Sequence, residues 1–316
     1  MNVDLERGAR IALGDCMGVK EGEKVLVVTD TVKRRIGEAL FKVASELRTE
    51  AMILVMLPRT RHGEEPPEAV AEAMKHADAV VCPTQFSLTH TQARKRACEA
   101  GARIATMPGI TEEMFSSGGL TANYNEVALL TKKIAERLMK AKTAVLVKDG
   151  SRLLLDLEGR RAIASTGLIR RPGEAGNLPS GEAYIAPVEG ESQGETIIDG
   201  SMAGVGRLRS PLRVTVRDGF ATAIAGEQAD QLVKALGPTR EARNIAELGI
   251  GTNKKARLIG NVLEDEKVYG TVHIAFGDNS TFGGKVKAGI HLDGVITRPT
   301  LYLDEELVME KGEFKF

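Results

Sequence analysis

The chain has 316 residues, which is more than most single domains contain and is enough for two. Basic and acidic residues both number 43, so the net charge gives no electrostatic reason to expect nucleic acid or a membrane surface as a partner. The three cysteines form no CxxC pair, there is no signal-peptide pattern, and no apolar run approaches the ~20 residues that span a bilayer. We therefore expect a cytoplasmic protein.

The first half of the chain alternates between helical and continuous apolar segments. Amphipathic or helical spacing is found at residues 3–18, 36–47, 66–76, 89–100 and 121–141. Continuous apolar strands are expected at residues 24–29, 51–56, 78–82 and 102–106. Buried strands separated by helices predict a parallel sheet with helices on both faces, which is a doubly wound, Rossmann-like α/β domain.

The second half changes to short alternating segments joined by glycine-rich turns. Strands are expected at residues 153–157, 183–186, 213–217 and 272–276, and the clearest helix at 227–236. This pattern predicts a mainly β, α+β domain. The predicted domains are therefore residues 1–142 and 143–316.

Two histidines and an aspartate of the second half have the spacing of metal ligands. His291 and Asp293 would share one face of a strand, roughly 6.6 Å apart along it, and could bind one ion, although an ordinary hydrogen-bonded pair has the same spacing. His273 would share its strand face with the small residues Thr271 and Ala275, while large apolar residues occupy the other face. Small neighbours leave space in front of the imidazole for an ion, although a solvated strand face has the same pattern.

Two glutamates interrupt apolar segments in a similar way. Glu182 and Glu247 would each be costly on a buried strand unless they were paired or bound to metal, and for each one alone a hydrogen-bonded carboxylate on an edge strand is the simpler interpretation. Together with Asp293 they bring three negative charges, which two divalent ions would nearly balance, and a bridging hydroxide would complete the balance. An oxygen-rich set with two imidazoles suits Zn, Mn, Co or Fe.

Sequence blocks in both halves match those of one enzyme family. In the first half they are residues 22–27, 87–91, 93–94 and 101–109. In the second half they are residues 181–182, 247–253, 264–267, 270–277 and 291–293. With these blocks in this order, the chain resembles the thermophilic metallo-aminopeptidases of the aminopeptidase T and aminopeptidase S type over nearly its whole length.

The resemblance implies a paired-metal site, with Zn, Co or Mn held by Glu182, Glu247, His273, His291 and Asp293. It further implies that Glu266 acts as a general base or additional ligand, and that the chain forms a homodimer. The same resemblance draws attention to His90, which would open a helix at the carboxyl end of the predicted sheet and contact substrate or transfer a proton. The main prediction is therefore an aminopeptidase-like hydrolase that removes N-terminal residues from peptides.

Two departures from that family keep other functions open. The chain is shorter than these peptidases, and Ser280 stands where they have a tyrosine, seven residues after the first metal-binding histidine. The predicted architecture is also similar to dihydroxypyridine ring-cleaving dioxygenases, in which two histidines and an aspartate hold one Fe(II). His273, His291 and Asp293 could supply that set. A metal-binding protein without peptidase activity is the third alternative.

Overall fold

The computed structural model describes residues 4–316, and its internal contacts divide the chain into two compact units. Unit 1 comprises the residues up to Val127 together with Gly167–Ser180, and unit 2 comprises Ala128–Thr166 and Gly181–Phe316. The boundary predicted at residue 142 divides the chain differently and stays a prediction. Among the described residues, no helix is both long and apolar enough to cross a membrane.

Unit 1 is organised around a parallel sheet. Its described strands follow the order β2-β1-β3-β4-β8, and all neighbours are parallel. The strands are β2 (Glu50–Met56), β1 (Lys24–Asp30), β3 (Ala79–Thr84), β4 (Arg103–Pro108) and β8 (Ala175–Asn177). The first four come from the alternating part of the sequence, whereas β8 returns from much later in the chain and extends the edge beside β4.

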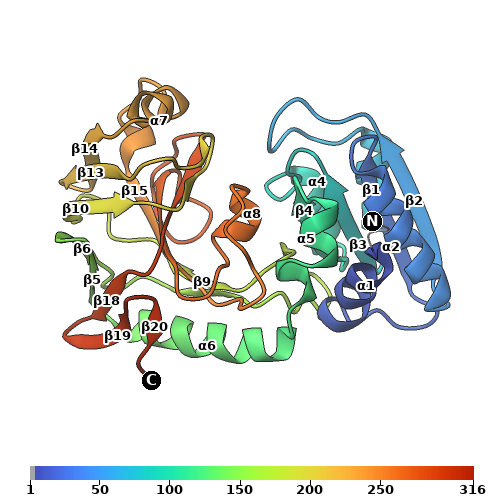
Figure 1. Cartoon of the computed structure of the whole chain (residues 1–316). Coiled ribbons are helices and arrows are strands. Elements are labelled where there is room, and N and C mark those ends of the chain that lie inside the picture. The colour runs from blue at the N-terminus through green and yellow to red at the C-terminus, as the bar shows by residue number, and fades with distance from the viewer. Residues whose placement is uncertain (1–3) are drawn as a thin grey trace. The chain divides into compact units, whose positions relative to one another are not determined.

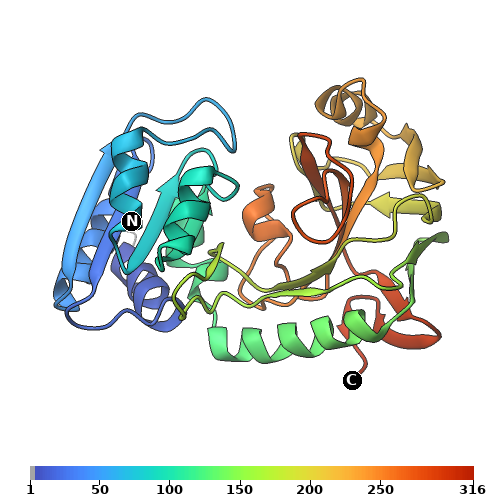
Figure 2. The same cartoon turned by 180° about the vertical axis from the view of Figure 1, so that it is seen from behind.

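Helices cover both faces of this sheet (Figures 1 and 2). Leu26 and Val28 of β1 pack in one hydrophobic cluster with α3 (Glu68–Lys75) and α4 (Gln92–Glu99). Thr29 points to the opposite face and lies against Gly37 of α2, where an added Cβ would be 2.7 Å from the threonine methyl carbon. The remaining helical segments of this unit are α1 (Leu5–Arg10), η1 (Ile11–Cys16), α2 (Arg34–Glu46), α5 (Glu112–Ser116) and η2 (Gly119–Thr121).

Unit 2 contains two antiparallel sheets in its described part. The eight-stranded sheet has the order β14 (Phe220–Ala225), β13 (Leu212–Arg217), β10 (Gln193–Ile198), β6 (Ser151–Asp156), β5 (Thr143–Lys148), β18 (Thr300–Leu303), β19 (Glu306–Glu310) and β20 (Glu313–Phe314). The seven-stranded sheet has the order β12 (Gly206–Arg207), β11 (Ser201–Met202), β17 (His291–Ile296), β16 (Val272–Gly277), β15 (Ile245–Gly251), β9 (Glu182–Ile185) and β7 (Ile163–Ser165).

One hydrophobic cluster joins the two sheets of unit 2. Val214 of the eight-stranded sheet belongs to it, as do Leu248 and Ile274 of the seven-stranded sheet. Three helical segments add to the same cluster: α6 (Tyr124–Lys140), α7 (Ala229–Leu236) and η3 (Glu241–Arg243). The short helix α8 (Val262–Asp265) is a further helical segment of this unit. Because side chains alternate along a strand, the neighbours of Ile274 on β16 point away from this core. That opposite face of the seven-stranded sheet is where the predicted site residues gather.

The predicted fold class is confirmed in both halves. The doubly wound parallel sheet and the mainly β second part are present, and most elements lie within a few residues of their predicted bounds. The helix predicted at 3–18 is an α-helix that continues as a π-helix, and Val3 lies outside the described residues. The helix predicted from residue 89 begins at Gln92, because the Thr91 hydroxyl caps it by accepting a hydrogen bond from the Arg94 amide.

Candidate metal centre

The predicted site residues lie on one face of the seven-stranded sheet. In an antiparallel pair, residues directly opposite each other point to the same side. The register pairs Ala275 with both Glu247 and Asp293, and it pairs Gly277 with His291. Continued across β15 and β9, the same alternation gives this face the following residues: Glu182, Tyr184, Glu247, Gly249, His273, His291 and Asp293.

A glycine creates the space for the His273 imidazole. Gly249 stands opposite His273 in the register of β15 and β16. A Cβ at Gly249 would lie 1.9 Å from Nε2 of His273, which is far inside contact distance. The imidazole therefore lies over the glycine, and His273 is fully buried.

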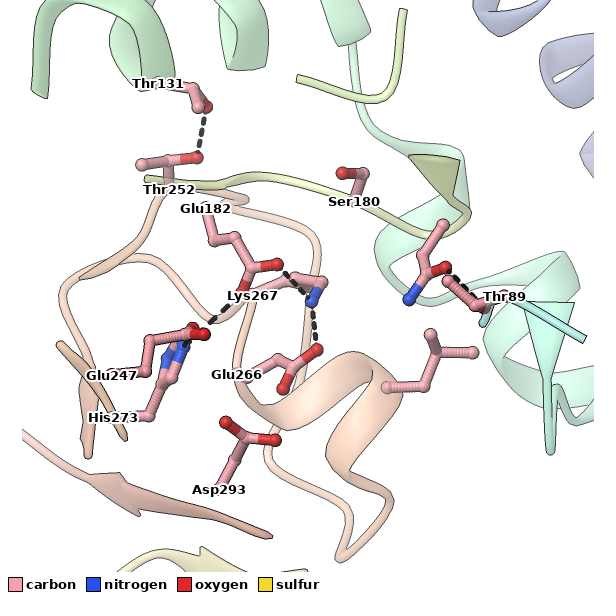
Figure 3. Close-up of polar contacts among 12 residues, drawn as sticks. Thr89, Thr131, Ser180, Glu182, Glu247, Thr252, Glu266, Lys267, His273 and Asp293 are labelled. Carbon is pink, nitrogen blue, oxygen red and sulfur yellow. Dashed lines mark hydrogen bonds and ion pairs between the residues drawn. The ribbon is translucent and has the colours of Figure 1, made fainter. Parts of the chain in front are cut away.

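The Glu247 carboxylate lies between the two histidines. Nε2 of His273 is 3.1 Å from Oε1 of Glu247, a contact drawn in Figure 3, and Nε2 of His291 is 3.5 Å from Oε2. The same nitrogen of His291 is 3.3 Å from Oδ1 of Asp293. Both imidazole Nε2 atoms thus face one small region that is bounded by the oxygens of Glu247 and Asp293.

The orientation of His291 is fixed from its other ring nitrogen. Its Nδ1 lies 2.7 Å from the backbone carbonyl oxygen of Asp278. Because a carbonyl can only accept, Nδ1 carries the proton and donates, which leaves Nε2 as the nitrogen available to a metal. Phe282, in the loop after β16, packs its ring edge-on against His291 and Tyr184, with ring centroids 5.6 and 5.5 Å apart.

A buried lysine lies beside this region. Lys267 follows α8, and its ammonium group donates a 2.8 Å hydrogen bond to Oε1 of Glu182 and forms an ion pair with Glu266 (Figure 3). Oε2 of Glu182 in turn lies 3.5 Å from Nε2 of His273. Glu182 therefore connects the lysine to His273.

The histidines hold protons tightly in this setting. Burial lowers the pKa of His273, but the hydrogen bond to Glu247 and the charges of nearby carboxylates outweigh it and raise that pKa to about 9. Burial likewise lowers the pKa of His291, whereas Asp293 and Glu247 raise it to about 10. With no metal bound, both imidazoles are therefore cations at neutral pH.

The pKa values of the carboxylates are shifted in different directions. Burial raises the pKa of Glu247 despite its hydrogen bond from His273, and burial raises the pKa of Glu266 to about 8 despite the adjacent Lys267. Burial also acts to raise the pKa of Asp293, but the positive charge of His291 outweighs it and holds that pKa well below its usual range. Asp293 is therefore the carboxylate that stays ionised most firmly.

The donor set fits a divalent metal. Ligand atoms lie within 4.8 Å of one another in two groups, Glu247 with His273 and Asp293, and Glu182 with Glu266 and His273. Among the described residues, the buried atoms Oδ1 of Asp293 and Oε2 of Glu182 have no hydrogen-bond partner. Each of these oxygens lies within 3.5 Å of a histidine Nε2, so a cation bound between oxygen and nitrogen would satisfy both.

The structure brings together Glu182, Glu247, His273, His291 and Asp293, with Glu266 beside them, although their roles as ligands stay predictions. His90 lies in unit 1, in an exposed turn before α4, so its catalytic role also stays a prediction.

Three features of the site were not predicted. Lys267 lies in a charged stretch, a pattern that is typical of an exposed surface. Its position directly after Glu266 was nevertheless a signal that it lies near the site. The space above Gly249 and the Asp278 carbonyl depend on strand register and loop path, which the sequence does not display.

Comparison with known proteins identifies a family along almost the full chain. The family model described as NicX: 2,5-dihydroxypyridine 5,6-dioxygenase matches residues 9–316. The 2,5-dihydroxypyridine 5,6-dioxygenase of Pseudomonas putida strain KT2440 is 26% identical over 271 residues, which cover 78% of this chain and 73% of that protein.

Two solved structures share the fold of the whole chain. The structure of 2,5-dihydroxypyridine dioxygenase from Pseudomonas putida KT2440 has a TM-score of 0.85 at 20% identity, covering 100% of this chain and 98% of the other. Wild-type AmpT from Thermus thermophilus has a TM-score of 0.72 at 17% identity, covering 98% of both chains. The resemblance to the aminopeptidases is therefore one of fold.

These matches correct the predicted activity. The main prediction of an aminopeptidase-like hydrolase is wrong, because the family model and the curated relative both point to a dioxygenase, an oxidoreductase. The prediction of an enzyme is confirmed, and a divalent metal cofactor agrees with both the family and the donor groups. The chain belongs to the family described as NicX: 2,5-dihydroxypyridine 5,6-dioxygenase.

Proposed function

We propose that this protein is an Fe(II)-dependent dioxygenase that opens the ring of 2,5-dihydroxypyridine or a closely related dihydroxylated aromatic compound. The observation that carries the proposal is the set His273, His291 and Asp293 on one sheet face, with both Nε2 atoms turned toward the Glu247 carboxylate. Two histidines and one carboxylate are the ligand set of non-haem Fe(II) oxygenases. The substrate is then a small molecule, and the expected homodimer and cytoplasmic location stay predictions.

The ligand residues are prepared for this role by their neighbours. The Asp278 carbonyl fixes the His291 ring with Nε2 free, and Gly249 leaves room for the His273 ring. Asp293 remains ionised because of the adjacent His291. A ferrous ion held there would supply the redox chemistry needed for dioxygen to react with a ring.

Other side chains of this face suit a phenolic substrate. Phe282 and Tyr184 present aromatic surface beside His291, which favours a flat ring. Burial and the surrounding carboxylates raise the pKa of Tyr184, so its hydroxyl stays a hydrogen-bond donor. Burial raises the pKa of Glu247, which makes it a suitable acceptor for the proton that a substrate hydroxyl loses.

The first prediction concerns turnover. Protein loaded with Fe(II) under anaerobic conditions should consume one dioxygen per 2,5-dihydroxypyridine, followed with an oxygen electrode and by loss of the ring absorbance. His291→Ala should lower the rate by about 100-fold or more, because it removes a proposed ligand. His76→Ala is the matched control and should keep full activity, since His76 is exposed at the end of α3 in unit 1.

Leucine p-nitroanilide with Zn- or Co-loaded protein provides the opposing assay. Hydrolysis of this peptide analogue, together with no oxygen uptake by the iron-loaded protein, would contradict the proposed function.

A second prediction follows from the raised pKa values of the histidines. Between pH 6 and 9 the metal must displace protons from His273 and His291, whose metal-free pKa values are about 9 and about 10. Raising the pH removes the competing protons, so Mn(II) affinity should rise, with release of up to about two protons per ion. Titration calorimetry in buffers of different ionisation enthalpy measures this number. An affinity that does not change with pH would show that metal binding displaces no protons from these histidines.

A third prediction tests the space above Gly249. Gly249→Ala puts a methyl group 1.9 Å from the present position of His273 Nε2, so the ring must move and Mn(II) affinity should fall by about tenfold or more. Gly14→Ala is the control, because an added Cβ there meets nothing within 4 Å. Equal affinities for both variants and the parent protein would mean that His273 does not bind metal from its present position.

A further inference from the structure

The Lys267 ammonium is held between two carboxylates that could otherwise bind a metal. It donates to Oε1 of Glu182 at 2.8 Å and pairs with Glu266, and the lysine is fully buried (Figure 3). Its backbone is also anchored, because its amide donates to the Glu264 carbonyl and its carbonyl accepts from the Asn253 amide. The positive charge is therefore fixed in place by the fold.

Those two carboxylates belong to the second of the two possible metal groups. Glu182 and Glu266 converge with His273, while Glu247 and Asp293 converge with the same histidine in the first group. Because Nε2 of His273 faces both groups and a single imidazole nitrogen binds one ion at a time, a second ion would depend mainly on the oxygens of Glu182 and Glu266. In the second group, however, an ammonium already contacts one oxygen of each carboxylate.

We propose that the Lys267 ammonium takes the position of a second divalent cation and so limits the site to one metal ion. A divalent ion in the second group would need the oxygens that Lys267 binds and would be repelled by its charge at close range. The first group keeps two carboxylates, whose charge one divalent ion balances. This inference rests on the proposed metal site, but it does not depend on the reaction.

This proposal also gives Glu182 and Glu266 a role other than metal binding in the wild-type protein. Both are carboxylate partners of Lys267, and Glu182 also faces His273 at 3.5 Å. They are positioning residues in the wild-type protein and become metal ligands when the lysine charge is removed.

The test is the number of Mn(II) ions bound per chain, measured by titration calorimetry and by elemental analysis after gel filtration. The wild-type protein should bind one ion. Lys267→Met should bind a second ion at least 100-fold more tightly than the wild type does, and spin coupling between the two ions should change the Mn(II) electron paramagnetic resonance spectrum. Lys267→Arg, which keeps the charge, should bind one.

Lys148 offers a matched control in the same unit. It is a buried lysine whose ammonium lies 2.8 Å from Oδ2 of Asp199 and donates to the Thr297 carbonyl. Lys148→Met should therefore lose a buried ion pair, as Lys267→Met does, and still bind a single ion. A second ion in this variant would mean that general loosening of the unit, rather than loss of the Lys267 charge, creates the extra site.

Two outcomes overturn the proposal directly. They are a wild-type protein that binds two ions with similar affinity, and a folded Lys267→Met variant that binds only one. Circular dichroism reports folding: a variant that folds only with two equivalents of Mn(II) supports the proposal, and one that stays unfolded at all Mn(II) concentrations refutes the replacement of ammonium by metal. If one ion binds to the wild type but the iron-loaded protein leaves 2,5-dihydroxypyridine intact, the proposed function fails and this inference stands.

Discussion

Three buried carboxylates on one face of a sheet, with a fourth, half-buried carboxylate beside them, require positive charge close by. Glu182, Glu247, Glu266 and Asp293 lie together at the seven-stranded sheet, and the metal-free protein balances them with Lys267 and two protonated histidines. An unpaired buried charge costs several kcal/mol, on the order of what a single domain has as its whole stability. The hydrophobic core lies on the other face of the same strands, so these charges are kept apart from it.

The division of each strand into two faces links the fold to the site. On β16, Ile274 packs in the core of unit 2, and the residue before it, His273, points toward the carboxylates. Gly249 on the neighbouring strand removes the one side chain that would block this arrangement. Metal binding at this face would therefore exchange protons on the histidines for a cation, on the side of the sheet away from the hydrophobic core.

Much of this could be predicted from the sequence, because strand alternation and apolar continuity are local patterns. These patterns predicted the parallel sheet and the mainly β second half. They also predicted that five residues form one group: Glu182, Glu247, His273, His291 and Asp293. Lys267 could not be recognised as buried, because burial depends on how α8 and β9 pack in three dimensions. Without this lysine, a charge count on three carboxylates favours two ions. The peptidase prediction came from the resemblance to the aminopeptidases, and the family match overturned it. Because a dioxygenase and AmpT share this fold, the fold does not decide the activity, which depends on the chemistry of the site.

The central claim is that this face holds one ion on His273, His291 and Asp293, with Lys267 in place of another. The most direct measurement is a crystal structure of the protein loaded with Fe(II) under anaerobic conditions, with anomalous diffraction recorded at the iron edge. The account predicts a single iron peak within bonding distance of both Nε2 atoms and an Asp293 oxygen, with the Lys267 ammonium still between Glu182 and Glu266. A second iron peak between Glu182 and Glu266, or a single peak away from His291, would contradict it.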